Sequence, residues 1–220
     1  SVPETREEGR FPVSRGGDHR IAAGSSAAVS KRHSGNIGVI WIDAHGDWNS
    51  EESTCTGNMH GMPFSAVCGY GPDCMVEFGQ GAAPVNVAHC VQVGGRDIDD
   101  LERQRMAQAG VTVFPIKMID KRGMGAVIGR AIQIAGEGTD GIHLSFDVDA
   151  ITPEAVPGTG VIVYNGLTPR EAFLAAEAIA ESRKLISMDM VEVNPFLDTA
   201  NKSGILASEL IQSALGKSVY

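Results

Sequence analysis

Two short clusters of acidic and histidine residues carry the chemistry that this sequence can perform. Each cluster directly follows an apolar, strand-like run; the first contains Asp43, His45 and Asp47, and the second contains Asp147 and Asp149. Carboxylates packed this densely beside buried strands repel one another and are costly to desolvate unless positive charge lies among them. The sequence therefore predicts that one or more cations bind between these two clusters.

The residue types favour a pair of divalent metal ions. Alternate residues of an extended chain point to the same side, so each cluster can present its ligands together, and His19 adds an imidazole from the segment Gly16-Gly17-Asp18-His19. Carboxylate and imidazole ligands without thiolate favour Mn²⁺ over Zn²⁺, with Fe, Co and Ni chemically compatible. Four carboxylates balance two divalent ions, which lie about 3.5–4 Å apart in such sites. Either acidic motif alone is more often a hydrogen-bonding turn, so the prediction depends on their combination.

Short β-rich runs alternate with longer segments of helical character, and this alternation positions the clusters. Strands are predicted at 11–14, 37–43, 91–94, 111–115, 141–147 and 185–192, and helices at 21–33, 100–109, 124–135, 169–183 and 203–215. The alternation is typical of an α/β fold with three α/β/α layers and a mostly parallel central sheet. Polar residues follow every predicted strand except 111–115, and open parallel sheets bind ligands at that edge. At Thr168-Pro169-Arg170-Glu171, the cap residue, the proline and the glutamate predict the start of a helix.

Composition predicts a single domain over residues 1–220 and excludes several classes of partner. The chain has 43% hydrophobic residues and a formal charge of -9. Nucleic acids and anionic membranes need a basic surface, whereas an acidic protein suits a small cationic substrate. The sequence contains no signal-like segment and no apolar run long enough to span a bilayer, which predicts a cytoplasmic protein. Its four cysteines lack a C-x-x-C pair and are interpreted as reduced thiols, mostly in the core.

Six successive motifs resemble the signatures of the ureohydrolase family, and within it the bacterial arginases more than the agmatinases. They occur in the family's order, from about Phe11 to the end of the chain. The motifs are Gly16-Gly17-Asp18-His19, Asp43-Ala44-His45-Gly46-Asp47, Gly57-Asn58-Met59-His60-Gly61-Met62-Pro63, Ser145-Phe146-Asp147-Val148-Asp149, Gly166-Leu167-Thr168-Pro169-Arg170-Glu171 and Val191-Glu192-Val193-Asn194-Pro195. The resemblance implies an arginase-like fold and hydrolysis of a guanidinium group with release of urea.

The resemblance also implies a role for each ligand of a dimanganese site. One ion would be held by His19, Asp43, Asp47 and Asp147, and the other by Asp43, His45, Asp147 and Asp149. A guanidinium carbon is a poor electrophile, and metal-activated water suits its hydrolysis at neutral pH. Asp47 would then move a proton toward the leaving amine, His60 would shuttle protons to solvent, and Glu192 would pair with the guanidinium.

Three further residues match the positions that read the amino-acid end of the substrate in arginase-like proteins. Asn49 and Thr56 match the carboxylate-reading positions, and Asp99 matches the acid that meets the α-amino group. Turn formation is the alternative interpretation for Asn49 and Thr56, and helix capping for Asp99. Arg170 and Glu171 resemble a pair at subunit interfaces of the family, which implies a homo-oligomer, a trimer or hexamer; an exposed ion pair is the alternative.

Several departures from the family pattern leave other functions open. Val161 replaces a hydroxyl residue expected near the guanidinium, and Arg20 places a cation close to the predicted metals unless it turns away. Only 15 residues precede the Gly-Gly-Asp-His motif, so the domain is predicted to be short at its N-terminus. The alternatives are hydrolysis of another guanidino or formimino compound, such as agmatine, guanidinobutyrate or formiminoglutamate, and a non-catalytic metal-binding protein of the same fold.

Overall fold

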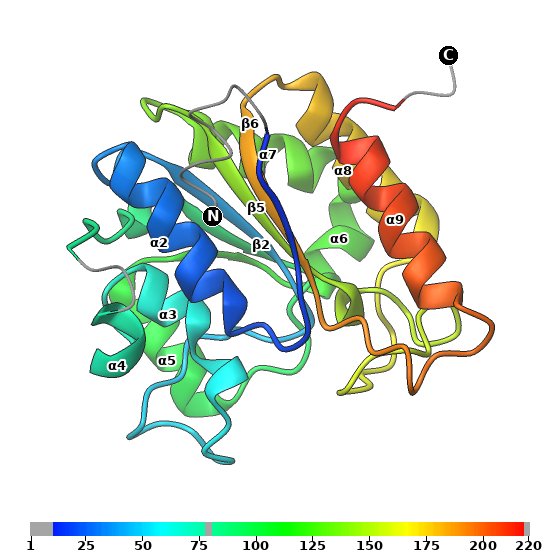
Figure 1. Cartoon of the computed structure of the whole chain (residues 1–220), viewed down its shortest axis with the longest axis horizontal. Coiled ribbons are helices and arrows are strands. Elements are labelled where there is room, and N and C mark those ends of the chain that lie inside the picture. The colour runs from blue at the N-terminus through cyan, green and yellow to red at the C-terminus, as the bar shows by residue number, and fades with distance from the viewer. Residues whose placement is uncertain (1–10, 78–80, 218–220) are drawn as a thin grey trace.

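The computed structural model describes residues 11–77 and 81–217, and a parallel β-sheet lies at its centre (Figure 1). The described strands are β1 (Val13–Arg15), β2 (Gly38–Ile42), β3 (Cys90–Val93), β4 (Thr112–Phe114), β5 (Ile142–Asp147) and β6 (Leu185–Val191). Their order across the sheet is β1-β6-β5-β2-β3-β4, and every pairing between them is parallel. The predicted α/β class with a parallel central sheet is therefore confirmed.

Helices cover both faces of this sheet. One face carries α2 (Ile21–Arg32), α3 (Pro63–Val67) and α5 (Asp100–Ala109), and α4 (Asp73–Val76) packs beside α3. The other face carries α6 (Ile116–Arg122), α7 (Met124–Gly136), α8 (Pro169–Glu181) and α9 (Lys202–Ala214). Short 3₁₀ turns lie at η1 (Met59–Gly61), η3 (Val87–His89) and η4 (Val148–Ala150). In Figure 1, α2 to α5 lie on the left of the sheet and α8 and α9 on the right, which gives the three predicted layers.

The two sides of the sheet differ in chemistry, and β5 shows why. Its alternate residues Ile142, Leu144 and Phe146 pack into the large apolar core beneath α7 and α8. The intervening residues His143 and Ser145 are equally buried, but they face the α2 side. Because side chains alternate along a strand, Asp147 continues this polar row to the carboxyl end of the sheet.

Two of the sequence-based expectations need correction. The residues after 111–115 form α6, which the sequence analysis missed because α6 is only seven residues long and ends at Gly123, whose φ is 77°. The cysteines are not mostly in the core, since Cys68 and Cys90 are buried but Cys55 and Cys74 are exposed. In contrast, the predicted cap of α8 is confirmed, because Thr168 Oγ1 accepts the N–H of Glu171 at 3.2 Å.

We find no helix among the described residues that is long and apolar enough to cross a bilayer. The first ten residues of the chain lie outside the described part. The strand expected at 11–14 is present as β1, one to two residues further along, and it pairs with β6 through Val13 and Met188.

Candidate metal centre and substrate cavity

The turn that follows β2 places the first acidic cluster at the carboxyl edge of the sheet. Asp43 directly follows β2, and its Oδ1 accepts the backbone N–H of His45 at 2.7 Å, which folds the chain back on itself. The N–H of Ala44 donates to Asp149 Oδ1 at 3.2 Å, so this turn is tied to the second cluster after β5. Local hydrogen bonds of this kind hold the acidic side chains close together independently of any bound ion.

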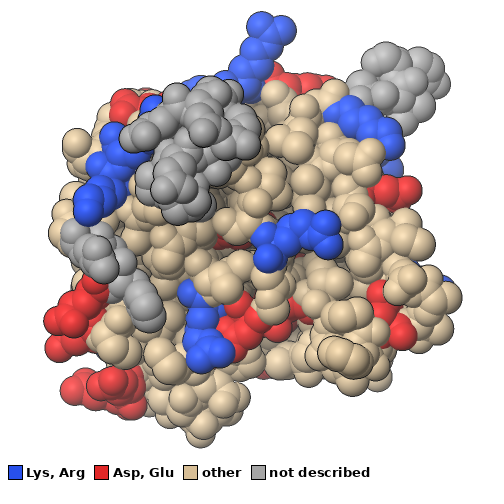
Figure 2. Space-filling view, viewed as in Figure 1, with Lys and Arg blue, Asp and Glu red and all other residues tan. Residues whose placement is uncertain are grey.

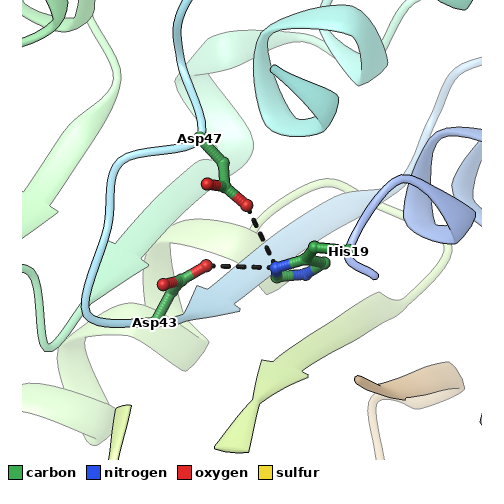
Figure 3. Close-up of side chains that lie close together, drawn as sticks. All are labelled: His19, Asp43 and Asp47. Atoms are coloured by element: carbon green, nitrogen blue, oxygen red, sulfur yellow. Dashed lines mark ion pairs between the residues drawn. The ribbon is translucent and has the colours of Figure 1, made fainter. Parts of the chain in front are cut away.

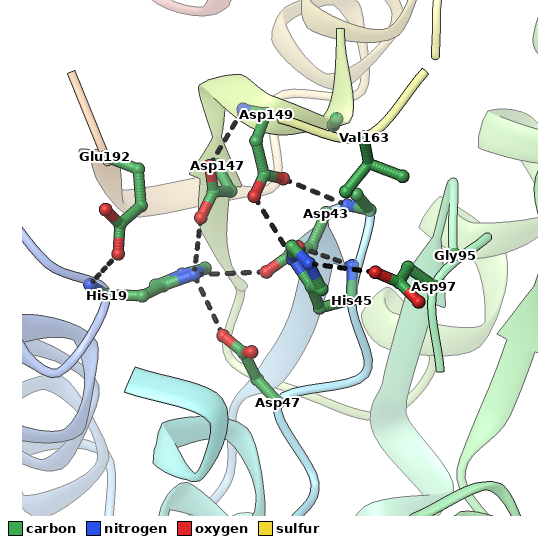
Figure 4. A network of polar contacts seen from close by, with 12 residues as sticks. His19, Asp43, His45, Asp47, Gly95, Asp97, Asp147, Asp149, Val163 and Glu192 are labelled. Atoms are coloured by element: carbon green, nitrogen blue, oxygen red, sulfur yellow. Dashed lines mark hydrogen bonds and ion pairs between the residues drawn. The ribbon is translucent and has the colours of Figure 1, made fainter. Parts of the chain in front are cut away.

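His19 lies in the turn between β1 and α2 and points its Nδ1 atom at three carboxylates. Nδ1 lies 3.1 Å from Asp43 Oδ2 and 3.0 Å from Asp47 Oδ2 (Figure 3), and 3.1 Å from Asp147 Oδ2 (Figure 4). The other ring nitrogen, Nε2, lies 2.8 Å from Ser145 Oγ, and the ring stacks on Trp41 with centroids 4.2 Å apart. The ring is therefore held on both sides with Nδ1 facing the acids.

His45 forms the centre of a second group beside the first. Its Nδ1 lies 3.2 Å from Asp43 Oδ1 and 3.1 Å from Asp149 Oδ2, as Figure 4 shows. Asp97 Oδ2 lies 3.8 Å from the Nε2 atom of the same ring. Asp43 thus faces both histidines, with one carboxylate oxygen toward each.

These acids lack sufficient positive charge around them. Burial, followed by the negative charge of Asp43, raises the pKa of Asp47 to about 8. Burial is also the main cause that raises the pKa of Asp147 and of Asp149. Burial opposes the charged form of His45, but hydrogen bonds to Asp149 and Asp43 outweigh it and raise its pKa to about 12. Positive charge placed among these groups would stabilise the ionised carboxylates.

The donor set fits two divalent ions. Two groups could each hold an ion, one formed by His19, Asp43 and Asp47 and the other by Asp43, His45 and Asp149. Among the described residues, the buried atoms His19 Nδ1 and Asp47 Oδ2 have no well-formed hydrogen bond, although they lie 3.0 Å apart. Buried polar atoms are normally satisfied, so these two atoms behave as ligands rather than as a hydrogen-bonded pair. Oxygen and imidazole donors without sulfur suit a hard or borderline metal ion.

A cavity of about 270 Å³ opens above this cluster. The residues predicted for catalysis and substrate binding all line it, namely Asp47, Asn49, Thr56, His60, Asp99 and Glu192. The structure thus brings together residues from the turns after β1, β2, β3, β5 and β6. Figure 2 shows acidic side chains grouped near the middle of the face viewed in Figure 1, beside single basic side chains. A cavity of this charge favours a cation.

Comparisons with known proteins agree with this site. The Arginase family model matches residues 1–216. The chain is 40% identical over 217 residues to the arginase of Bacillus caldovelox, covering 99% of this chain and 72% of that one. It is 42% identical to the arginase of Staphylococcus aureus strain COL, with coverages of 99% and 72%. This chain belongs to the arginase family.

The same relationship holds in three dimensions. The crystal structure of arginase from Bacillus cereus superposes with a TM-score of 0.95 at 42% identity, and the match covers 100% of this chain and 75% of that chain. The arginase-like fold that the motifs implied is therefore confirmed.

Two site residues of this arginase-family chain adopt a backbone conformation that is costly for residues other than glycine. Asp47 has φ 50° and Glu192 has φ 61°. Glu192 is held there by two hydrogen bonds, since its N–H donates to Gly17 O at 2.8 Å and its Oε1 accepts the N–H of His19 at 2.8 Å. Non-glycine residues in the left-handed region cluster at functional sites, where surrounding contacts hold them in place.

The proposed substrate-reading residues also perform the local tasks that the sequence analysis gave as alternatives. Thr56 Oγ1 accepts the N–H of Asn58 at 3.1 Å, and Asp99 forms a capping box with Glu102 at the start of α5. The Oδ1 atom of Asn49 accepts the hydroxyl of Ser53 at 2.8 Å, which orients its amide. These bonds fix the side chains while leaving them on the cavity wall.

Sequence reasoning missed several cavity residues. Those that line it without having been predicted as site residues are Thr54, Cys55, Asn58, Asp97 and Glu102. Glu102 is the most constrained, because its Oε1 accepts the N–H of Trp48 at 2.8 Å and burial raises its pKa to about 7. In the sequence, Glu102 is the third residue after Asp99, which is the spacing of a capping box, and this spacing could have indicated its place at the start of α5.

One departure noted in the sequence, Arg20, is now explained. The Arg20 side chain turns away from the acids, and its Nε donates to Asp18 Oδ1 at 2.9 Å on the surface. Arg170 pairs with Glu177 at 2.9 Å in an exposed ion pair, while Glu171 caps α8. Val161 lines the cavity with 38% of its surface exposed.

Proposed function

We propose that this protein is an arginase, which hydrolyses L-arginine with water to L-ornithine and urea using two Mn²⁺ ions. A single observation carries the proposal. Two groups of metal-ligand atoms lie at the base of a cavity whose walls carry further carboxylates, Glu192 and Asp99 among them. Arginine has positive charge at both ends, so one acid for each end and an activated water between them match this substrate.

The metal ligands divide between two ions. His19 and Asp47 would hold the first ion and His45 and Asp149 the second, while Asp43 and Asp147 would serve both. Support comes from Asp43, whose two oxygens lie near different histidines, and from Asp147 Oδ2, which lies 3.1 Å from His19 Nδ1. Bound divalent ions supply Lewis-acid activation of water at neutral pH.

The residues around the cluster then guide proton movement. Glu192 pairs with the guanidinium group, and its carboxylate is held by the backbone of the metal ligand His19. As the new carbon–oxygen bond forms and the carbon–nitrogen bond breaks, Asp47 takes the proton of the attacking water and delivers it to the leaving amine.

His60 exchanges protons between this site and solvent. Its Nδ1 lies 3.7 Å from Glu192 Oε1, and 30% of its side chain is exposed. The nearby Glu192 carboxylate is the main cause that raises the pKa of His60 above its usual value. A raised pKa keeps a fraction of the imidazole protonated near neutral pH, as a proton shuttle requires.

Asn49, Thr56 and Asp99 read the amino-acid end of the substrate. The Oδ1 atom of Asn49 is engaged by Ser53, so its amide N–H groups remain to donate to a carboxylate. The Thr56 hydroxyl accepts one backbone bond and keeps its own proton to donate. Asp99 offers the negative charge that an α-ammonium group needs.

Val161 leaves a second candidate open. Its methyl groups line the cavity where a hydroxyl residue was expected, and so reduce the polar contacts available to a guanidinium group. Agmatine and guanidinobutyrate carry the same guanidinium group as arginine, so this change does not select arginine over them. A metal-binding protein without catalytic activity is the remaining alternative.

The test combines metal analysis with a panel of substrates. The protein is loaded with Mn²⁺, the ions per chain are measured, and urea release is followed from arginine, agmatine and guanidinobutyrate. We expect two ions per chain and the highest kcat/KM on arginine. Full metal loading without urea release from any substrate would support the non-catalytic alternative. A higher kcat/KM on agmatine than on arginine would support the second candidate. The variant Lys217→Gln at the C-terminal end of the described residues is a control that changes charge away from the cavity.

We further propose that the chain folds as a single domain over residues 1–220 and that the protein is cytoplasmic. We propose that it assembles into a homo-oligomer, a trimer or hexamer. The acidic composition supports the location, and the likeness of Arg170 and Glu171 to the pair at the family's subunit interfaces supports the assembly, although Arg170 pairs with Glu177 of its own chain. Light scattering coupled to size-exclusion chromatography gives the oligomer size, and a monomeric mass would contradict it.

A further inference from the structure

The Arg96 side chain is half-buried beside the metal-ligand cluster, and it binds backbone carbonyl groups. Its Nη2 donates to the carbonyl oxygens of Asp149 at 2.7 Å and Val163 at 2.8 Å, and its Nη1 donates to Ala150 O at 3.1 Å. Its Nε donates to Tyr164 O at 3.0 Å. The guanidinium group is planar and its N–H directions are fixed, so four such bonds set the spacing of two chain segments.

The backbone of Arg96 is attached to a third segment. Its N–H donates to Ala44 O at 2.8 Å, and the N–H of Asp97 donates to the same oxygen at 3.0 Å. Ala44 lies between the predicted ligands Asp43 and His45. A single residue thus connects the turn after β2, the segment after β5 and the residues near Val163, which lies beside Asp149 in Figure 4.

The segment that Arg96 holds has little regular structure of its own. Residues 152–166 contain neither helix nor strand, and one isolated bridge between Ile151 and Leu167 closes their base. Val161, on the cavity wall, is two residues before the carbonyl that Arg96 binds at Val163. Irregular segments with few backbone partners open easily unless other contacts hold them.

Geometry explains this arrangement better than charge does. Burial lowers the pKa of Arg96 and thus opposes its charged form, although the nearby acids, Asp149 first, partly offset this. A permanent positive charge also repels divalent ions bound nearby. The positive charge of Arg96 would therefore weaken metal binding. Its hydrogen bonds, in contrast, would hold the metal ligand Asp149 in place.

We propose that Arg96 is a positioning residue. It holds Asp149 in place to bind the ion that Asp43 and His45 would also bind, and it holds the cavity wall in place at Val161. It thereby sets the affinity for that ion and the selectivity among guanidino substrates. The selectivity part rests on the proposed function, and the metal part does not.

The test uses two substitutions of the same residue. Arg96→Lys keeps the positive charge but loses the planar fork, and Arg96→Met keeps only the aliphatic stem. Arg130→Lys and Arg130→Met on α7 are matched controls, because Arg130 is exposed and bonds only to Gln133 among the described contacts. Isothermal titration with Mn²⁺ gives the dissociation constants of both ions, and kcat/KM is measured for arginine and agmatine. Circular dichroism shows that each variant is folded.

We expect both Arg96 variants to weaken one of the two Mn²⁺ ions by about tenfold or more, as is usual when support of a metal ligand is lost. The other ion should change less, and the ratio of kcat/KM between arginine and agmatine should shift. The Arg130 variants should leave all four quantities unchanged. If Arg96→Met does not fold, Arg96→Lys carries the comparison alone.

Two results would overturn the proposal. Wild-type Mn²⁺ affinities in Arg96→Lys would show that charge suffices and that the fork has no role. An equal weakening of both ions with an unchanged substrate ratio would show a general loss of stability. If the wild-type protein hydrolyses no guanidino substrate, the proposed function fails, but the Mn²⁺ titrations still decide the metal part.

Discussion

Replacing Asp99 with asparagine tests how the cavity recognises arginine. Asp99 lies on the cavity wall and is exposed, and its side chain also caps α5. Asparagine caps helices as well as aspartate does, so the helix should be preserved while the negative charge is lost. A hydrogen bond to a charged group contributes about 1.5–3 kcal/mol, and exposure to solvent and salt places this one at the lower end. About 1.5 kcal/mol corresponds to roughly a tenfold loss in kcat/KM.

The assay measures kcat/KM for urea release from L-arginine and from 5-guanidinopentanoate, which is arginine without its α-amino group. We expect Asp99→Asn to lower the value for arginine by about tenfold and to leave the other substrate nearly unchanged. Asp100→Asn is the matched control, because Asp100 is the next residue, is 84% exposed and pairs with Arg103 on the surface. Unchanged kcat/KM on arginine, or an equal loss on both substrates, would refute the assignment of Asp99 to the α-amino group.

Three further predictions concern metal binding and stability. Chelation of bound Mn²⁺ should lower Tm by roughly 6–12 °C for each ion that had been present at about 100 times its Kd, and unchanged calorimetric scans would argue against a structural contribution of the ions. Asp189→Asn should cost about 3–5 kcal/mol in urea unfolding, because it breaks a buried pair with His143 at 3.0 Å. Burial opposes the charged form of Asp189, but the neighbouring His143 and a hydrogen bond from Ser25 outweigh it and lower the pKa of Asp189 in the folded state. This contribution is therefore present above the unfolded pKa of about 3.9 and should fade as the pH falls through the folded value. Thr168→Ala should cost about 1 kcal/mol, or roughly 2–4 °C in Tm, and a variant as stable as wild type would mean that the cap contributes nothing.

The sequence predicted much of the fold because its signals are local. The buried strand β2 is a continuous apolar run, β5 alternates apolar with polar residues, and the start of α8 carries a cap, a proline and a glutamate within four residues. Such patterns depend on neighbours in the chain, which a sequence displays directly. The short helix α6 escaped because its seven residues show too little periodicity between a strand and Gly123.

The metal-ligand candidates were also visible in the sequence, since they are grouped at the ends of strands. The supporting residues were not, because their roles depend on distant partners. Glu102 lies 54 residues from Trp48, whose N–H it accepts, and Arg96 lies 53 residues from Asp149. Cys55 and Cys74 proved exposed, since composition cannot show which thiols face solvent.

The sequence by itself determined which chemistry is available here: four carboxylates and two imidazoles placed where parallel strands end, with too little positive charge around them. That conclusion follows from residue type and spacing alone. Only the tertiary structure decided that His19 faces three carboxylates at once, that Asp43 serves both histidines and that Arg96 joins three segments. These relations join atoms from strands far apart in the chain, and their distances are set by packing of the sheet rather than by local sequence.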